Sequence, residues 1–343
     1  MLENDLPKVA VIGAGISGLI CARVLVEHGM EVTVFEKSRG IGGRMSTRRS
    51  PEGYHFDHGA QYFTVREERF RRYVDSWAAE GLVARWEGRI CVLRCGEVAE
   101  KGEPLARFVG IPGMNAVCKR LATNLRVKLP CEVASVGHAD NAWRLLDLEA
   151  KPLGTFEAVL VSTPAPQAAA LLEAVPGLAN RVGQVTMSPC WAVMTVFRRK
   201  LPLVFAGAFV HESPISWISR NSSKPERPDT PETWVLHASS DWSREHLEDA
   251  QEEVARALLD EFWRATRHPR VEAEYVAAHR WRYAQPREPL PESYLSDLES
   301  RIGACGDWCG GPRVEGAFLS GLALASAVVD AVGKTQRQPE TNG

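Results

Sequence analysis

The sequence predicts an α/β protein in which a Rossmann-type nucleotide-binding domain is interleaved with a second, mixed-sheet α+β domain. Two observations predict this fold class. Residues 8–36 read as strand, glycine-rich turn, helix and strand, and residues 302–332 again lead from a short strand through a glycine-rich turn into a helix. A chain of 343 residues suits about two domains.

The first of these segments has the pattern of a βαβ unit. Residues 9–12 form a short apolar run of the kind found in buried parallel strands. Residues 16–28 have helical spacing with one apolar face, and residues 32–35 repeat the strand pattern. The order of these elements places the start of the helix at the carboxyl edge of a parallel sheet, where ligands bind.

The turn of this unit carries G-x-G-x-x-G. Gly13 permits a tight turn, Gly15 lets the backbone approach a pyrophosphate, and Gly18 lets helix and strand pack closely. The helix N-terminus offers unpaired N–H groups to phosphates, and Glu36, which ends the second strand, can accept from ribose hydroxyls. Because strand, helix and acid are all present, the segment predicts dinucleotide binding more specifically than the glycines alone.

Composition limits the partners and the compartment. The formal net charge of −2 gives no global electrostatic case for binding nucleic acid or an anionic membrane. The N-terminal MLENDLPK is acidic and lacks the apolar region of a signal peptide. The eight cysteines form no C-x-x-C pair, so we expect buried or incidental thiols in a reducing cytoplasm and no metal site.

The segment after Glu36, KSRGIGGRMSTRR, is basic and rich in glycine. It leaves the second strand at the ligand-binding edge, so its arginines are expected near the phosphates rather than on a solvated loop. Residues 54–64, YHFDHGAQYFT, read as a short aromatic strand that breaks at Asp57-His58-Gly59. A surface hairpin with core aromatics is the alternative for this segment.

Further elements follow from hydrophobic periodicity and from breaker residues. Helices are expected over residues 66–80, 115–122, 167–175 and 243–264, the last with Ser243 as a possible cap. Strands are expected over residues 90–93, 131–136, 143–148, 158–162, 191–197, 203–210, 217–220, 234–237 and 276–283.

The C-terminal part contains a further glycine-rich segment. Residues 302–307 read as a short strand that ends in Gly306-Asp307, and Arg313 leads into a long helix rich in small residues. Its apolar stretch, residues 316–332, is too short and carries too many polar groups for a membrane span, so a buried helix is expected. The polar tail from residue 333 is expected to be disordered.

These motifs resemble the flavoprotein amine oxidase superfamily, which includes monoamine oxidases, polyamine oxidases, protoporphyrinogen oxidase, phytoene desaturases and renalases. The resemblance is carried by the G-x-G-x-x-G unit ending in Glu36, by Gly42-Gly43-Arg44, and by Gly306-Asp307 before the last helix. It implies an amine oxidase or p-hydroxybenzoate hydroxylase-like topology and FAD as cofactor. The Ser-Gly-Gly-Cys-Tyr segment that links flavin covalently in monoamine oxidases is not seen, so noncovalent FAD is expected.

The resemblance also implies roles for single residues. Glu36 would bind the adenosine ribose, Val133 the adenine, Asp307 the ribityl chain, and backbone N–H groups at Val314 and Glu315 the pyrimidine edge of the flavin. The predicted cofactor-binding residues are Gly13, Ala14, Gly15, Ile16, Ser17, Gly18, Glu36, Lys37, Gly43, Arg44, His58, Gly59, Ala60, Gln61, Val133, Asp307, Val314 and Glu315.

Four stretches, GGRMSTRRS, FDHGAQYFT, HRWRYAQP and CGDWCGGPRVEGAFLSG, resemble bacterial renalase-like proteins in particular, and this likeness runs from about residue 8 to residue 332. It implies oxidation of the 2- and 6-dihydro isomers of NAD(P)H, with the hydride passing to flavin N5 and O₂ becoming H₂O₂. Such chemistry needs orientation and shielding more than acid–base groups.

Candidate substrate-binding residues follow from this reading. Tyr62, His279 and Trp281 are expected to form the walls of the site. Arg313, beside the flavin motif, is expected to meet the carboxamide or a phosphate, and Asn221 and Lys224 the ribose or pyrophosphate at the rim. Two other functions stay open: a flavin amine oxidase acting on a small amine, and a flavin-binding protein without turnover. The FAD-binding domain is predicted over residues 1–70, 107–165 and 297–335, the substrate domain over 71–106 and 166–296, and a disordered tail over 336–343.

Overall fold

The computed structural model describes residues 6–100 and 105–335. The predicted disordered tail, 336–343, lies outside them. The chain forms two compact units, each assembled from separate stretches. Unit 1 comprises Met1–Gly43, Cys118–Met187 and Pro286–Gly343, and unit 2 comprises Arg44–Val117 and Ser188–Gln285. Both predicted domains are likewise interrupted in sequence, although these divisions fall at different residues.

Unit 1 is built on a largely parallel sheet in the order β19-β20-β13-β1-β2-β9. The pairs from β20 to β9 are parallel and β19 pairs antiparallel with β20. Residues 9–12 of strand β1 are buried, and the strand contacts α1 and β12. The strands are β1 (Lys8–Ile12), β2 (Glu31–Phe35), β9 (Arg126–Lys128), β13 (Ala158–Val161), β19 (Leu295–Asp297) and β20 (Ile302–Ala304).

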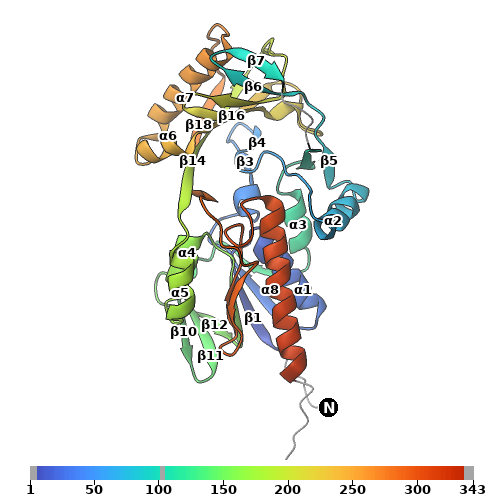
Figure 1. Cartoon of the computed structure of the whole chain (residues 1–343), viewed down its shortest axis with the longest axis vertical. Helices are drawn as coiled ribbons and strands as arrows, with labels where there is room; N and C mark the ends of the chain where they lie inside the picture. Colours follow the sequence, from blue (N-terminus) through green and yellow to red (C-terminus); the bar gives the residue numbers. More distant parts are fainter. Residues whose placement is uncertain (1–5, 101–104, 336–343) are drawn as a thin grey trace, which may run out of the picture. The chain divides into compact units, whose positions relative to one another are not determined.

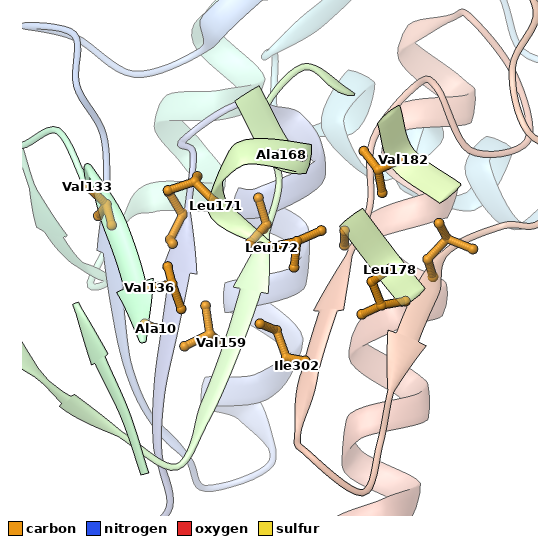
Figure 2. Packing of buried hydrophobic residues seen from close by; sticks show 14 of the residues in the cluster. Ala10, Val133, Val136, Val159, Ala168, Leu171, Leu172, Leu178, Val182 and Ile302 are labelled. Carbon is orange, nitrogen blue, oxygen red and sulfur yellow. The ribbon is translucent and has the colours of Figure 1, made fainter. Parts of the chain in front are cut away.

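Helices α1 (Ile16–Glu27) and α8 (Val314–Thr335) pack against each other in unit 1 (Figure 1). A Cβ added at Gly321 would collide with the carbonyl oxygen of Ser17, so the helices meet backbone to backbone. Elsewhere in the unit, α4 (Ala165–Leu171) and α5 (Pro176–Gly183) bury Leu171, Leu172 and Leu178 in a core that also contains Val159 and Ile302 (Figure 2). A hairpin sheet adds β10 (Ser135–Ala139), β11 (Ala142–Leu146) and β12 (Pro152–Phe156).

Unit 2 is built on a mixed sheet in the order β18-β14-β17-β16-β15-β6-β7. Its core holds Trp191, Trp234 and Phe262, where α7 (Gln251–Thr266) packs on the sheet. The strands are β6 (Ile90–Arg94), β7 (Glu97–Glu100), β14 (Met187–Phe197), β15 (Gly207–His211), β16 (Ile215–Arg220), β17 (Glu232–Ala238) and β18 (Tyr275–Pro286).

Smaller elements complete the chain. Two short sheets pair β3 (Thr47–Arg49) with β4 (His55–Asp57) and β5 (Val83–Arg85) with β8 (Phe108–Gly110). The helices are η1 (Gly43–Met45), α2 (Glu68–Ala79), α3 (Ala116–Ala122), η2 (Asn221–Ser223), α6 (Ser240–Glu245) and α7 (Gln251–Thr266). A Rossmann-like unit interleaved with a mixed-sheet α/β unit confirms the predicted fold class.

The single helix predicted over residues 243–264 is wrong. The structure has α6 and α7 with a break between them, and Ser239 rather than Ser243 caps α6 by accepting the N–H of Trp242. At the break, side chains from other elements donate hydrogen bonds to backbone carbonyls. The Trp191 indole donates to His246 O at 2.9 Å, and Arg280 donates to Leu247 O. Those carbonyls face side chains of other elements, and the helix ends there.

The strand predicted over residues 131–136 is also shifted. The observed strand is β10 (Ser135–Ala139), and residues 131–134 lie outside any strand between β9 and the hairpin. Cys131 N–H instead donates to Glu36 O at 2.8 Å, which ties this crossing to the end of β2. Val133 is buried in the core of unit 1.

One helix among the described residues is long and apolar enough to cross a membrane, with its window at Val314–Ala331. Of that window, 56% is buried inside the structure, as in the core helix of a globular unit. This burial agrees with the buried helix expected from the sequence.

Candidate functional site

The glycine turn between β1 and α1 has the geometry of a phosphate cradle. Gly13 has φ +110°, and a Cβ there would lie 2.7 Å from Ser162 O. A Cβ at Gly18 would collide with Gly13 O, whereas nothing lies within 4 Å of a Cβ built at Gly15. Gly13 and Gly18 are therefore required by packing, while Gly15 faces open space that a ligand can enter.

Helix α1 starts at Ile16 with Gly15 as its N-cap, and no side chain caps it. The N–H groups of its first turn are thus left for an external acceptor such as a phosphate. No acidic residue lies in that first turn, so nothing there repels an anion. The residues of this turn fit a dinucleotide pyrophosphate.

Glu36 lies at the end of β2 and is 8% exposed. Its carboxylate accepts the N–H of Ala14 at 2.9 Å and the N–H of Ser38 at 2.8 Å. These bonds fix the carboxylate beside the glycine turn, and a carboxylate has further lone pairs for ribose hydroxyls. The neighbouring Lys37 instead lies at the surface, 3.9 Å from Glu132.

The second glycine turn folds back onto the first. Gly42 N–H donates to Ala14 O at 2.8 Å, and a Cβ at Gly43 would lie 3.5 Å from Gly15 Cα. Gly42 and Gly43 have φ of +112° and +51°, values that glycine adopts readily. The two glycine turns therefore form one backbone-lined surface in unit 1.

The C-terminal glycine segment is tied to the start of α1. Ser17 Oγ donates to Cys305 Sγ at 3.1 Å, and Gly306 N–H donates to Ser320 Oγ of α8 at 3.0 Å. Asp307 and Glu315 are 6% and 2% exposed, and Arg313 Nε lies 4.0 Å from Glu315 Oε2. Two segments far apart in sequence thus converge near the N-termini of α1 and α8, as binding of one extended cofactor requires.

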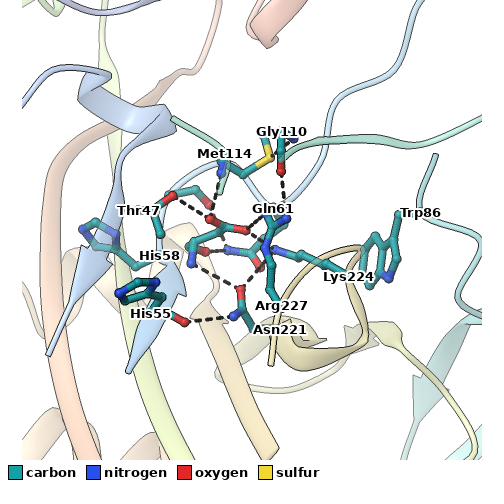
Figure 3. Close-up of polar contacts among 12 residues, drawn as sticks. Thr47, His55, His58, Gln61, Trp86, Gly110, Met114, Asn221, Lys224 and Arg227 are labelled. Atoms are coloured by element: carbon teal, nitrogen blue, oxygen red, sulfur yellow. Dashed lines mark hydrogen bonds and ion pairs between the residues drawn. The ribbon is translucent and has the colours of Figure 1, made fainter. Parts of the chain in front are cut away.

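In unit 2, Asp57 is the centre of a buried polar network. Figure 3 labels its partners Thr47, Met114, Lys224 and Arg227. Its Oδ1 accepts from Thr47 Oγ1 at 2.8 Å and from the N–H of Met114 at 3.0 Å. Its Oδ2 accepts from Lys224 Nζ at 3.3 Å and from Arg227 Nη2 at 2.6 Å. Burial alone would raise the pKa of Asp57, but the two cations lower it to about 2. The carboxylate is therefore charged at neutral pH.

Lys224 has a fully buried side chain, so it does not lie at an exposed rim. Besides Asp57, it donates to Gln61 Oε1 at 3.2 Å and to Asn221 Oδ1 at 3.5 Å. Burial, opposed by Asp57, lowers the pKa of Lys224 to about 8. With Lys224 protonated, two cations face one carboxylate and the network carries net positive charge.

The segment after Asp57 is held from several sides. Gln61 donates to Asp57 O and to Gly59 O, and Ala60 N–H donates to Arg44 O at 2.8 Å. A Cβ at Gly59 would collide with Arg44 O, which explains the glycine at this position. The segment 58–61, predicted to contact the flavin, is therefore rigidly placed against Arg44.

Histidine and tryptophan side chains pack beside this segment. His58 and His279 lie edge to face with centroids 4.8 Å apart, and Trp281 donates to His58 O at 3.0 Å. Burial, with His279 and Arg48 nearby, lowers the pKa of His58 to about 3, and burial with Arg48 lowers that of His279 to about 4. Both rings are neutral at neutral pH. Within the described residues, His58 Nδ1 has no hydrogen-bond partner, which leaves it for a ligand atom.

Sequence reasoning named Gln61, His279, Trp281, Asn221 and Lys224 as site residues, and the structure places all of them in unit 2 close to Asp57 or His58. It missed the residues that connect them, which are Asp57, Thr47, Met114 and Arg227. The adjacency of Asp57 to His58-Gly59, and the K-P-x-R spacing of Lys224 and Arg227, were the available signals.

Within the described ranges, no group of three or more His, Cys, Asp or Glu side chains could hold a metal ion. The eight cysteines are free thiols. Burial raises the pKa of Cys118 to about 12 and that of Cys305 to about 11, so these thiols are poor nucleophiles at neutral pH.

Comparison with known proteins agrees with this geometry. Residues 11–77 match a family model described as an NAD(P)-binding Rossmann-like domain, and residues 87–329, more than half of the chain, match one described as flavin containing amine oxidoreductase. The chain is 48% identical to a 4,4'-diapophytoene desaturase (4,4'-diaponeurosporene-forming) from Staphylococcus aureus (strain Newman) over 52 residues. That match covers 15% of this chain and only 10% of the relative.

Solved structures share the fold over nearly the whole chain. A protein assigned as a protoporphyrinogen oxidase from Exiguobacterium sp. 255-15 superposes with a TM-score of 0.77 at 13% identity, covering 94% of this chain and 98% of that one. Cyclohexylamine oxidase from Brevibacterium oxydans IH-35A gives 0.72 at 14% identity, covering 96% and 100%. Putrescine oxidase bound to putrescine gives 0.70 at 14%, covering 95% and 99%. At such identities these similarities establish the fold alone.

Proposed function

Because the chain belongs to the flavin containing amine oxidoreductase family, a family of flavin-dependent enzymes, we propose that it is an oxidase of the 2- and 6-dihydro isomers of NAD(P)H with noncovalently bound FAD. The reaction converts the isomer, O₂ and a proton into β-NAD(P)⁺ and H₂O₂. The bound flavin would supply the acceptor for the hydride and the two-electron path to O₂. A cytoplasmic location is part of this proposal.

The chain's own residues would hold the cofactor along its length. The open turn at Gly15 and the uncapped start of α1 suit the pyrophosphate, and Glu36 suits the adenosine ribose. Asp307 and the N-terminus of α8 at Val314 suit the ribityl chain and the pyrimidine edge.

The substrate assignment rests on the net positive charge of the Asp57 network, which contacts the 58–61 segment. Lys224 and Arg227 outnumber Asp57 in a buried network that contacts Gln61 directly. In such surroundings an anionic dinucleotide is attracted, and the ammonium form of an amine is repelled. The flanking histidines have lowered pKa values and are therefore weak bases, which suits a substrate whose hydride leaves without help from a base.

An amine oxidase is the second candidate, favoured by the cyclohexylamine and putrescine oxidases with the same fold. It needs a neutral amine beside the flavin, and the net positive charge would assist deprotonation while weakening capture of the cation. A flavin-binding protein without turnover is the third reading.

The experiment mixes the FAD-loaded protein anaerobically with each dihydro isomer, with cyclohexylamine and with putrescine, while flavin absorbance is followed. We expect rapid bleaching by at least one isomer and none by the amines. Bleaching by an amine alone would assign the protein to the amine oxidases, and no bleaching by any compound would favour the binding-protein reading.

A further inference from the structure

Three aromatic side chains and one arginine in unit 2 form a cluster at one end of the Asp57 network. Its members, called the aromatic cluster below, are Tyr62, Trp86, Trp217 and Arg107. The ring of Tyr62 lies 5.5 Å from that of Trp217 and 6.2 Å from that of Trp86, centroid to centroid. The guanidinium carbon of Arg107 lies 5.2 Å from the Tyr62 centroid, on the ring face. The cluster thus surrounds Tyr62, a residue predicted from the sequence to line the substrate site.

Two N–H donors in this cluster are buried without an acceptor. Among the residues that the structure describes, neither Trp217 Nε1 nor Arg107 Nε has a hydrogen-bond partner, although their residues are only 6% and 9% exposed. By contrast, the neighbouring Trp86 Nε1 donates to Ser223 Oγ at 3.1 Å. A buried unpaired donor costs about 1–3 kcal/mol, so two beside one ring indicate an acceptor supplied from outside the chain.

The chemistry of that acceptor follows from its surroundings. Tyr62 is only half-buried, so the cluster reaches solvent there. Arg107 brings positive charge, and Lys224 Nζ lies 5.7 Å from the Trp86 centroid. A planar ring can pack against these aromatic faces, and a carbonyl or carboxylate oxygen on it can accept from Trp217 and Arg107. A protonated amine satisfies neither donor.

We propose that Arg107 and Trp217 form a subsite for the carboxamide oxygen of a nicotinamide-type ring, with Tyr62 and Trp86 as its aromatic walls. This assignment rests on the proposed function, since it names the residues that recognise the substrate's ring. Arg107 and Trp217 are then specificity-determining residues, because they distinguish a ring bearing an acceptor oxygen from one without it.

The test measures binding rather than turnover, so it is independent of the oxidase activity. Nicotinamide and 3-methylpyridine, which has the same ring without the acceptor oxygen, are titrated into FAD-loaded wild type, Trp217→Phe and Arg107→Gln by calorimetry. We expect wild type to bind nicotinamide about tenfold more tightly than 3-methylpyridine, and each variant to lose about tenfold for nicotinamide alone.

Two matched variants control for general effects. Trp242→Phe replaces a tryptophan in α6 that stacks on His246. Arg94→Gln replaces an exposed arginine that pairs with Glu212. Neither should alter the affinity for nicotinamide. The melting temperature of each variant shows that it is folded, and either of the two cluster variants alone suffices for the test.

Equal affinities of wild type for the two probes, or unchanged nicotinamide binding in both cluster variants, would overturn the subsite and leave an aromatic core whose donors bind water. Failure of the proposed function is a separate result: the dihydro isomers would then leave the flavin oxidised, whatever the variants do to nicotinamide binding.

Discussion

Asp57→Asn should destabilise the folded protein by about 3–5 kcal/mol, the cost of removing one partner from a buried ion pair. The side chain of Asp57 is fully buried, and its Oδ2 is the carboxylate atom that faces both Lys224 and Arg227. Asparagine can still accept from Thr47 and Met114 through its oxygen. Its amide group, however, would place N–H donors against Lys224 and Arg227. These two buried cations would then have no negative charge beside them.

The pH dependence of this loss has a definite sign. In wild type the pKa of Lys224 is lowered to about 8, and without Asp57 it falls further because an attractive charge is gone. In the pH range between the folded-state pKa and the ordinary value of 10.5 for lysine, the unfolded chain binds more protons. Stability therefore rises with pH there. Raising the pH from 7 to 8 should recover part of the stability of Asp57→Asn and little of that of wild type.

The assay is urea unfolding of the FAD-loaded protein followed by tryptophan fluorescence. Asp140→Asn is the control, because Asp140 pairs with Arg144 on the surface with 82% of its side chain exposed, and such pairs contribute about 0–1 kcal/mol. Adding Arg227→Met to Asp57→Asn should restore stability by removing one unpaired cation. A loss of less than about 1 kcal/mol in Asp57→Asn would refute the view that this carboxylate stabilises the network.

Three other outcomes are expected. In a fluorescence titration, Gly18→Ala should weaken FAD binding at least about tenfold, because the added Cβ would collide with Gly13 O. Gly177→Ala is the control: a Cβ at this position in α5 has free space, so the affinity for FAD should not change. As the pH falls below 6.5, His58 stays neutral in the folded state while it becomes protonated in the unfolded state. At pH 5 the free energy of unfolding of wild type, measured in urea, should therefore have fallen by about 2 kcal/mol more than that of His58→Gln. Equal losses would contradict the lowered pKa of His58. Acid precipitation should release all FAD into the supernatant, whereas a yellow pellet would show a covalent link.

The geometry of the first glycine turn and of Glu36 could be predicted from the sequence because it is local. Gly13, Gly15, Gly18 and Glu36 lie within one βαβ unit, and each is constrained by its own turn or strand end. The geometry of such a unit follows from backbone sterics and the helix dipole alone.

The Asp57 network could not be predicted in the same way. Its members come from β3, β4, the turn before α3 and the segment after η2, so their approach depends on tertiary packing and not on sequence spacing. The sequence predicts Lys224 at the rim of the substrate site, whereas the structure buries its side chain against Asp57. The break between α6 and α7 has the same cause, since Trp191 and Arg280 reach it from other elements.

The central claim, that the flavin of this enzyme oxidises a dihydronicotinamide dinucleotide, is tested most directly by a single turnover with product analysis. One equivalent of a 2- or 6-dihydro isomer of NAD(P)H is mixed with the FAD-loaded protein, air is then admitted, and the products are separated and quantified. We predict one β-NAD(P)⁺ and one H₂O₂ for each isomer consumed. Recovery of the isomer unchanged, with the flavin oxidised throughout, would contradict the account.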